Sequence, residues 1–280
     1  MNKLYLLVLL VATAACQHQA PQNATAATAE PTAAPDPNDS DAAKAAQVAA
    51  DTTLTAPMRA LLQQHDLAPL WASRSEGQPA KSALEGFYGT SPYRISFYFS
   101  QVVRDVQEPT LFHVTGLNRY HRVITPFTGT IRVQAVQPFA DSMHADVDST
   151  ARCFTATARF VLREDPRTKG AGNYAGTALL DFYVDAQGRI DQAMMLDGTQ
   201  NPTQGCGLLF RGTQTSNQTG RRQPVAFAGF YGAVVPDALL HLGLGDRSDE
   251  VNPNLARLGW NEAWENDEWW AASPKPKLSL

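Results

Sequence analysis

The segment YRISFYFS, residues 93–100, decides the fold class. Its large apolar side chains Ile95, Phe97 and Phe99 fall at every second position, and Arg94, a serine or a tyrosine stands between them. Successive side chains of a β-strand point to opposite faces, so a period of two predicts a strand with one buried face.

The same alternation returns along the middle of the chain. In the segment 152–163 one face carries Phe154, Ala156, Ala158, Phe160 and Leu162, and in 174–185 it carries Ala178, Leu180, Phe182 and Val184. DAQG (185–188) is typical of a turn, after which 189–196 returns as a hairpin partner. Further strands are predicted at 112–115, 130–136, 207–212 and 225–231.

These strands predict an all-β fold. No long helical pattern separates them, so an antiparallel meander of about eight strands is expected, forming a closed or nearly closed barrel. Residues 53–280 then make a single β-rich domain of 228 residues. A short helix is expected at its start, where Thr55 can cap and Pro57 stands in the first turn. A helical C-terminal cap is expected over 233–272.

The first sixteen residues predict export and a lipid anchor. Lys3 is followed by the apolar run 4–12, small residues and Cys16, which is the pattern of a signal peptide (residues 1–15). The run is too short to span about 30 Å of bilayer, which needs roughly 20 residues. VATAAC (11–16) resembles the lipobox of bacterial lipoproteins, although Thr13 stands where Leu is commonest. The resemblance implies acylation of Cys16; the alternative is an ordinary signal peptide with an incidental cysteine.

Residues 16–52 are expected to form a disordered tether behind that anchor. They are rich in Ala, Pro and Thr, and residues 17–52 contain no aromatic side chain. Such a composition cannot bury enough apolar surface to offset the entropy of ordering. The predicted location is therefore the bacterial cell envelope, which includes the periplasm. The protein is expected to be anchored to a membrane there, and the outer membrane is favoured.

Cys153 and Cys206 remain once Cys16 is assigned to the anchor. In an oxidising compartment such a pair predicts a disulfide bond. Two free, buried thiols are the alternative.

Three sets of residues are candidate binding sites. An apolar cavity lined by Phe97, Phe99, Phe160 and Phe182 would hold a small ligand, whereas a filled interior would indicate a structural protein. Trp260 and Trp264, one helical turn apart, would stack on a glycan or contact a partner, although packing on the domain is the favoured interpretation.

His113 and His121 would face each other if a hairpin turned around Leu117, which would suit two metal ligands. Two solvated histidines are the alternative. No other cofactor is predicted.

Charge and motifs narrow the function. The net charge of −4 shows no basic footprint for nucleic acid. No nucleophile elbow or triad spacing is found, and Glu164-Asp165 beside Pro166 is interpreted as a solvated turn. The barrel loosely resembles lipocalin-like proteins, with an aromatic GFY segment at 86–88. The leading prediction is a binding protein for a small apolar ligand, a glycan or an envelope partner; the alternatives are a structural lipoprotein and a hydrolase with an unrecognised site.

Overall fold

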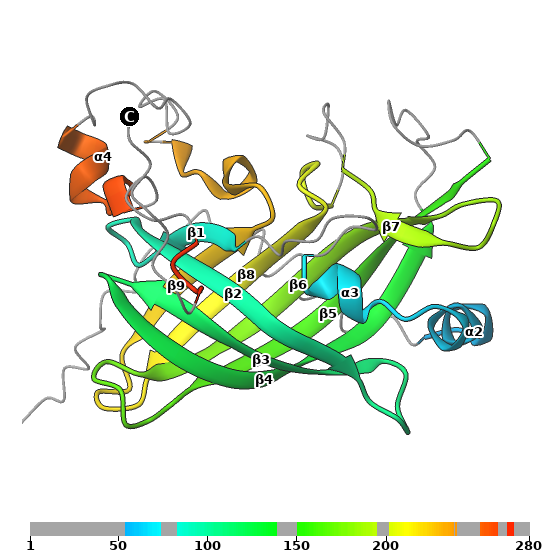
Figure 1. Cartoon of the computed structure of the whole chain (residues 1–280), viewed down its shortest axis with the longest axis horizontal. Helices are drawn as coiled ribbons and strands as arrows, with labels where there is room; N and C mark the ends of the chain where they lie inside the picture. Colours follow the sequence, from blue (N-terminus) through cyan, green and yellow to red (C-terminus); the bar gives the residue numbers. More distant parts are fainter. Residues whose placement is uncertain are drawn as a thin grey trace, which may run out of the picture. The chain divides into compact units, whose positions relative to one another are not determined.

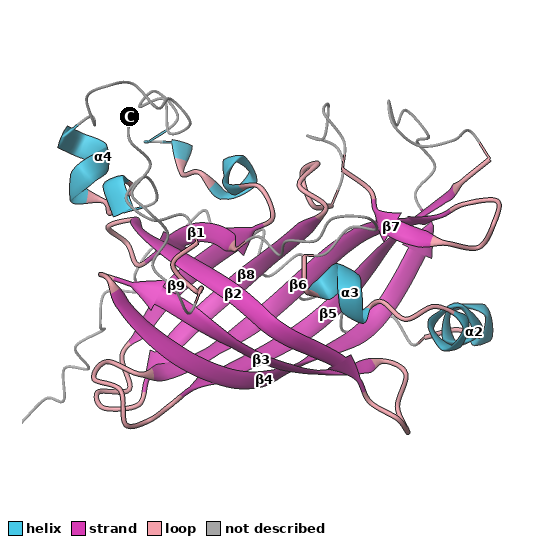
Figure 2. Ribbon diagram, in the orientation of Figure 1, coloured by secondary structure: helices cyan, strands magenta, loops and turns pink. Residues whose placement is uncertain are grey.

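The computed structural model describes residues 54–73, 83–138, 150–194, 202–237, 239, 253–262 and 268–271. Every described residue lies within the compact unit Pro37–Leu280. Strands dominate that unit (Figures 1 and 2). They are β1 (Leu84–Tyr88), β2 (Tyr93–Arg104), β3 (Leu111–Tyr120), β4 (Val123–Pro138), β5 (Arg152–Glu164), β6 (Gly172–Val184), β7 (Ile190–Gln192), β8 (Leu208–Ser216) and β9 (Arg222–Ala228).

Eight of these strands close into an antiparallel barrel. Their order is β5-β4-β3-β2-β1-β9-β8-β6, and pairing between β5 and β6 completes the circle. The short strand β7 extends β6 outside this circle. The prediction of an eight-stranded antiparallel meander is therefore confirmed, and the architecture is compatible with lipocalin-like barrels.

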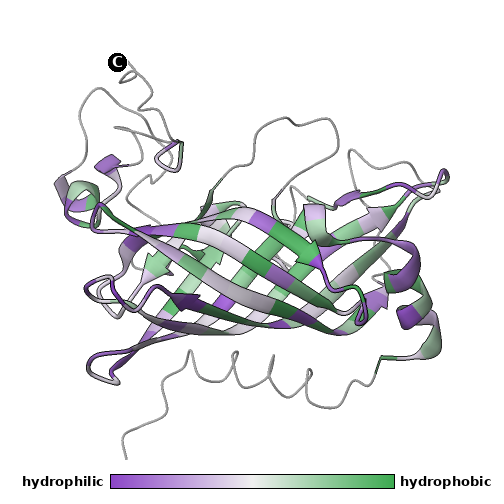
Figure 3. Ribbon diagram, turned by 60° about the horizontal axis from the view of Figure 1, so that its bottom comes forward, coloured by the Kyte–Doolittle hydropathy of each residue, from purple (hydrophilic) through white to green (hydrophobic). Residues whose placement is uncertain are grey.

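The alternation of apolar and polar residues sets which side chains enter the barrel. In β2, Ile95 and Phe97 are fully buried, and inward positions of neighbouring strands pair with them in register. Hydrophobic and hydrophilic positions alternate along the strands in Figure 3. Because a shift of one residue would turn every such side chain outward, the pattern fixes the register.

Two inward glycines allow β6 and β8 to approach closely. Gly176 pairs with Gly212. A Cβ atom on Gly176 would lie 2.1 Å from the carbonyl oxygen of Arg211, and one on Gly212 would lie 2.2 Å from that of Ala175. The two strands can approach this closely only because neither residue has a side chain.

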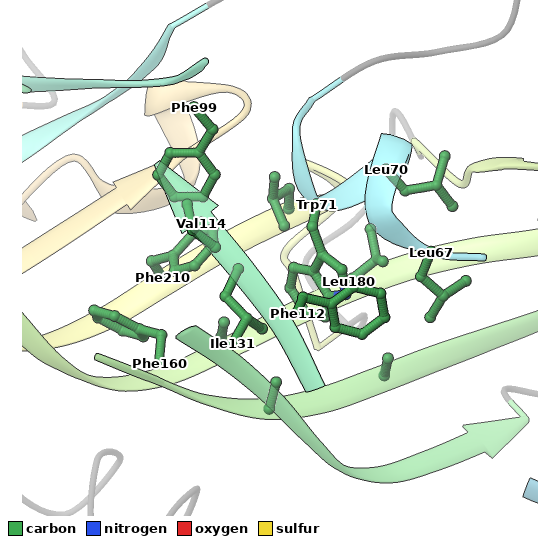
Figure 4. Packing of buried hydrophobic residues seen from close by; sticks show 14 of the residues in the cluster. Leu67, Leu70, Trp71, Phe99, Phe112, Val114, Ile131, Phe160, Leu180 and Phe210 are labelled. Carbon is green, nitrogen blue, oxygen red and sulfur yellow. The ribbon is translucent and has the colours of Figure 1, made fainter. Parts of the chain in front are cut away.

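The N-terminal helices α2 (Ala56–Gln64) and α3 (Ala68–Trp71) close one end of the barrel, which we call the helix end. α2 begins after Thr55 with a proline in its first turn, as predicted. Trp71 is fully buried, and its ring centroid lies 6.4 Å from that of Phe112 and 6.2 Å from that of Phe210 (Figure 4). An indole and its neighbouring leucines thus fill this opening.

The C-terminal segment packs on the outer wall. Helix α4 (Pro253–Arg257) begins at the proline, and a 3-10 helix spans Tyr231–Val234. Leu255 and Trp260 are buried in a cluster with Phe87 of β1, whose ring lies 5.5 Å from Trp260. The expected C-terminal cap is present in the described residues as short helical turns; Trp264 lies outside them.

The hairpin predicted around Leu117 is wrong. The segment 112–115 belongs to the longer strand β3, which continues through Gly116 to Tyr120. A Cβ atom on Gly116 would lie 2.3 Å from the carbonyl oxygen of Tyr98. This glycine therefore marks a close approach between two backbones, not a turn.

Candidate functional site

The middle of the barrel is occupied by a column of aromatic rings. The ring of Phe227 stacks between Phe97 and Phe210, with centroid distances of 4.0 and 4.6 Å. Phe99 and Phe160 contact Phe210 edge-on at 5.6 and 5.2 Å. Three of the four predicted pocket residues, Phe97, Phe99 and Phe160, thus come together around the rings of Phe210 and Phe227.

Phe182, the fourth of these residues, is also fully buried. Its ring stacks on Phe154 of β5 at 5.5 Å, and the two residues are paired across β5 and β6. Phe154 stands near the start of β5, and Phe182 stands near the end of β6. Phe182 therefore contributes to the same core farther toward the helix end.

The opposite end of the barrel holds polar groups. Here the short turns join β1 to β2, β3 to β4, β5 to β6 and β8 to β9, and we call it the hairpin end. Glu164, the last residue of β5, points inward and is 7% exposed. Its carboxyl oxygen Oε1 accepts hydrogen bonds from Asn118 Nδ2 at 2.5 Å and from the hydroxyl of Tyr174 at 3.2 Å. The backbone N–H of Gly172 donates to Oε2 at 2.6 Å.

The register explains why these side chains meet. Inward positions follow β5 from Phe160 through Leu162 to Glu164, and Leu162 pairs with Tyr174 of β6. Tyr174 in turn pairs with Gln214 of β8. Glu164 therefore occupies the last inward position of β5, and Tyr174 and Gln214 stand at inward positions of β6 and β8 near the same end of the barrel.

Burial raises the pKa of Glu164, and the hydrogen bonds from Asn118, Gly172, Tyr174 and Gln214 partly oppose that rise. Burial also raises the pKa of the Tyr174 hydroxyl, with the neighbouring Glu164 adding to the effect. The carboxyl group of Glu164 can accept a hydrogen bond when it is ionised and donate one when it is protonated.

A ladder of tyrosines joins this network to the rim. The hydroxyl of Tyr88 donates to Gln214 Oε1 at 3.1 Å, and its ring lies edge-on to Tyr120 at 4.7 Å. Tyr120 contacts Tyr93 at 5.5 Å, and Tyr93 stacks on the exposed His121 at 3.7 Å. Partly buried rings therefore lead from solvent to the residues around Glu164.

The rim is fixed from outside. Glu262 is 5% exposed, accepts a hydrogen bond from the hydroxyl of Tyr93 at 3.0 Å, and lies 3.5 Å from both Arg119 and Arg122. Burial and this hydrogen bond raise the pKa of Tyr93 to about 12. The C-terminal segment thus holds the turn between β3 and β4 in place.

His113 and His121 are not opposed to each other. His113 stands in β3 opposite Thr130, and its Nε2 lies 2.9 Å from a carboxylate oxygen of Asp105. His121 stands in the turn after β3, with a positive φ of 48°. Eight residues of extended strand separate them, roughly 26 Å. Among the described residues no group of three or more His, Cys, Asp or Glu side chains is arranged to hold a metal ion.

Cys153 and Cys206 are free, buried thiols, so the predicted disulfide bond is wrong. Cys153 is the second residue of β5 and Cys206 precedes β8, and these two strands flank β6 on opposite sides. Strands separated by a third lie roughly 9–10 Å apart, whereas a disulfide needs Cα atoms within about 7 Å. Burial raises the pKa of both thiols, that of Cys206 to about 11.

Trp260 lies under the C-terminal cap instead of on its surface. It is 3% exposed and contacts Phe87, Tyr231 and the guanidinium of Arg94, whose carbon lies 5.7 Å from the indole. This environment is that of a packed side chain. Trp264 and Cys16 lie outside the described residues.

Sequence reasoning missed Glu164. Glu164 follows Phe160 and Leu162 at every second position, which indicates an inward side chain, but the nearby Pro166 favours a turn. The turn in fact begins at Asp165, whose carboxylate binds Arg167.

Comparison with protein families, with curated proteins and with solved structures finds no match for this chain. Among the described helices, none combines the length and apolar character that crossing a membrane requires.

Proposed function

We propose that this protein is a lipid-anchored lipoprotein of the bacterial envelope whose barrel binds one small, largely apolar ligand at the hairpin end. The observation that carries the proposal is the buried carboxyl group of Glu164. Its site is inside the barrel, is polar, and is joined to the rim by the ladder of Tyr88, Tyr120 and Tyr93.

A buried carboxyl group is costly for packing alone. Taking a carboxylate out of water costs several kcal/mol, and apolar replacements of buried ionic groups are often neutral or stabilising. The helix end shows the cheaper solution, since Trp71 and its apolar neighbours fill it. A buried ionisable group among convergent polar side chains is a candidate binding site.

The surroundings of Glu164 indicate the ligand chemistry. Phe127 of β4, directly opposite Glu164, and Phe97 of β2, whose ring lies 5.2 Å from that of Tyr174, are buried and apolar. A ligand with an apolar body and one amine or hydroxyl donor would satisfy both kinds of group. The aromatic column limits how deeply it can enter, and eight-stranded barrels hold one small ligand at most.

The test uses N-phenyl-1-naphthylamine, an apolar dye with one N–H donor whose fluorescence rises in apolar surroundings. Wild-type protein is expected to bind it, and Glu164→Gln to bind roughly tenfold more weakly, because a hydrogen bond to a charged group contributes about 1.5–3 kcal/mol. Asp165→Asn, which removes the neighbouring carboxylate outside the barrel, is the matched control and should bind as wild type does. Absence of binding, or equal affinity in all three proteins, would refute the site.

A structural lipoprotein with a filled interior is the second candidate. The mutual stacking of Phe97, Phe227 and Phe210 favours it, because rings in contact leave no room for a ligand between them. The dye experiment distinguishes the two functions, because a structural barrel with a filled interior would not increase the fluorescence of the dye.

A further inference from the structure

Five strands of the barrel carry two rows of arginines on their outer face. In the first row Arg132 of β4 pairs with Arg159 of β5, and Thr177 of β6 lies between Arg159 and Arg211 of β8. In the second row Thr128, Arg163, Asn173, Thr215 and Arg222 follow one another from β4 to β9. We call this surface the arginine wall.

Most of these arginines have no acidic partner among the residues that the structure describes. Arg132 forms an ion pair with Glu108. Within the described part of the chain, no ion pair is formed by Arg159, Arg163, Arg211 or Arg222, which are all exposed. The guanidinium groups of Arg211 and Arg222 donate 3.3 Å hydrogen bonds to the carbonyl oxygen of Ala233 and the hydroxyl of Thr213, and Arg211 also donates to the side-chain amide oxygen of Gln204 at 3.3 Å.

This arrangement costs stability in the absence of a ligand. Like charges directly opposite each other on neighbouring strands, as in Arg132 and Arg159, are destabilising. The chain as a whole is acidic, with a net charge of −4, so the wall is a local concentration of positive charge and not a consequence of composition.

Small side chains separate the two rows. The row between them consists of Thr130, Val161, Ala175, Thr213 and Pro224. The arginine rows lie four residues apart, or about 13 Å, and Arg159 and Arg211 stand two strand spacings apart, or roughly 10 Å. The wall thus offers separated cationic points with hydroxyl and amide groups beside them.

We propose that the arginine wall binds an extended acidic polysaccharide. Guanidinium groups bind carboxylate and phosphate bidentately, and the threonine hydroxyls and Asn173 supply hydrogen bonds for sugar hydroxyls. The spacing of the arginines fits charges repeated along a polymer. This surface lies outside the barrel and is independent of the small-ligand site proposed at Glu164.

Two other polyanions fit the wall less well. Single-stranded nucleic acid is bound by aromatic platforms between cationic groups, and neither row nor the row between them holds an aromatic residue. A membrane surface is usually engaged with large apolar side chains beside the basic ones. The large exposed apolar residues among those described, Val103, Val106, Val123, Ile124, Met194 and Phe230, all lie outside these rows.

The experiment measures binding of alginate, a polymer of uronic acids, with uncharged dextran as the blank. The wall variant is R159Q/R163Q/R211Q/R222Q. The matched control, R59Q/R167Q/R189Q/R257Q, makes the same change in net charge at exposed arginines outside the wall. Wild type and control should bind alginate with affinity that falls as salt is added, and the wall variant should bind roughly tenfold more weakly or worse.

Three results would overturn the proposal: no binding of alginate by wild type at low salt, equal losses in the two variants, or tighter wall-dependent binding to phosphatidylglycerol vesicles or to a DNA oligonucleotide. Thermal melting of the wall variant should match wild type or exceed it, which shows that a loss of binding is not a loss of fold. The wall variant should also bind N-phenyl-1-naphthylamine as wild type does, so failure of this proposal and failure of the Glu164 site are distinguishable.

Discussion

Glu164 differs from the other acidic residues of the strands in the direction of its side chain. Glu85 and Asp181 stand at outward positions: Glu85 forms an ion pair with Arg94 of β2, and Asp181 accepts a hydrogen bond from Thr203 in the turn before β8. Glu164 stands inside the barrel. An acid whose pKa is raised in the folded state binds a proton more tightly there than in the unfolded chain. Stability therefore falls as pH rises from the unfolded pKa, about 4.3, through the folded one.

Glu164→Gln tests this directly. Relative to the variant, wild type is expected to lose stability as pH rises through that window, by about 1.4 kcal/mol for each unit of pKa shift. Urea unfolding of both proteins across pH 4–8 measures it. Asp165→Asn is the control. The hydrogen bond from Arg167 lowers the pKa of Asp165 to about 2, so wild type loses the stability of that contact only as pH falls below about 4, and the difference from Asp165→Asn should stay constant across pH 4–8. A stability difference for Glu164→Gln that is constant with pH contradicts the assignment.

Single residues also show where sequence reasoning stopped. The inward set could be read from alternation alone, since Phe97, Phe160 and Phe182 are all buried as expected. The partners of Glu164 could not, because Asn118, Tyr174 and Gln214 come from three other strands and meet only through the register. The number of cysteines alone predicts a disulfide bond between Cys153 and Cys206. The strand order, which the number of cysteines does not reveal, places their strands on opposite sides of β6.

At the scale of elements, the period of two predicts the strands, whereas the hypothesis of a hairpin around Leu117 is wrong. β3 continues from Leu111 to Tyr120 without a turn, and Gly116 stands within it. A glycine required by a turn and one required by a close backbone approach look alike in a sequence; only the partner strand separates them.

The close approach of β6 and β8 gives a prediction. Gly176→Ala would place Cβ 2.1 Å from the carbonyl oxygen of Arg211, so the strands must separate, at a cost of about 1–3 kcal/mol. Gly188→Ala is the control: its Cβ meets nothing within 4 Å, and only the positive φ of 78° is unfavourable. Denaturant unfolding compares the two. A smaller loss for Gly176→Ala than for Gly188→Ala would contradict the packing of β6 on β8.

The C-terminal cap gives a second prediction. Trp260→Ala removes an indole packed on Phe87 and Tyr231 and is expected to cost about 3–5 kcal/mol, with a large fall in melting temperature. Phe230→Ala removes a neighbouring ring that is 54% exposed and should change melting little. If Trp260→Ala melts as wild type does, the cap does not stabilise the barrel, and a binding role for Trp260 takes precedence.

At the scale of the molecule, three separate features are proposed: a lipid anchor, a ligand site inside the barrel and the arginine wall outside it. The anchor rests on the pattern that ends at Cys16. The interior site rests on Glu164, and the wall on the arginine rows.

Cys16→Ser tests the anchor. A serine cannot be acylated as the thiol is, so the variant should appear in the soluble envelope fraction or keep its signal peptide. Membrane fractionation and intact mass in the native bacterium distinguish these. A mature variant that still sediments with membranes would show that attachment does not depend on lipid at this position.

We propose that the barrel holds a small ligand against Glu164. Native mass spectrometry of protein purified gently from its native host tests this proposal, with Glu164→Gln and Asp165→Asn prepared in parallel. We expect a discrete non-covalent mass on wild type that is reduced or lost in Glu164→Gln and kept in Asp165→Asn. Wild type with no non-covalently bound mass in any preparation would contradict the proposal and leave a structural barrel.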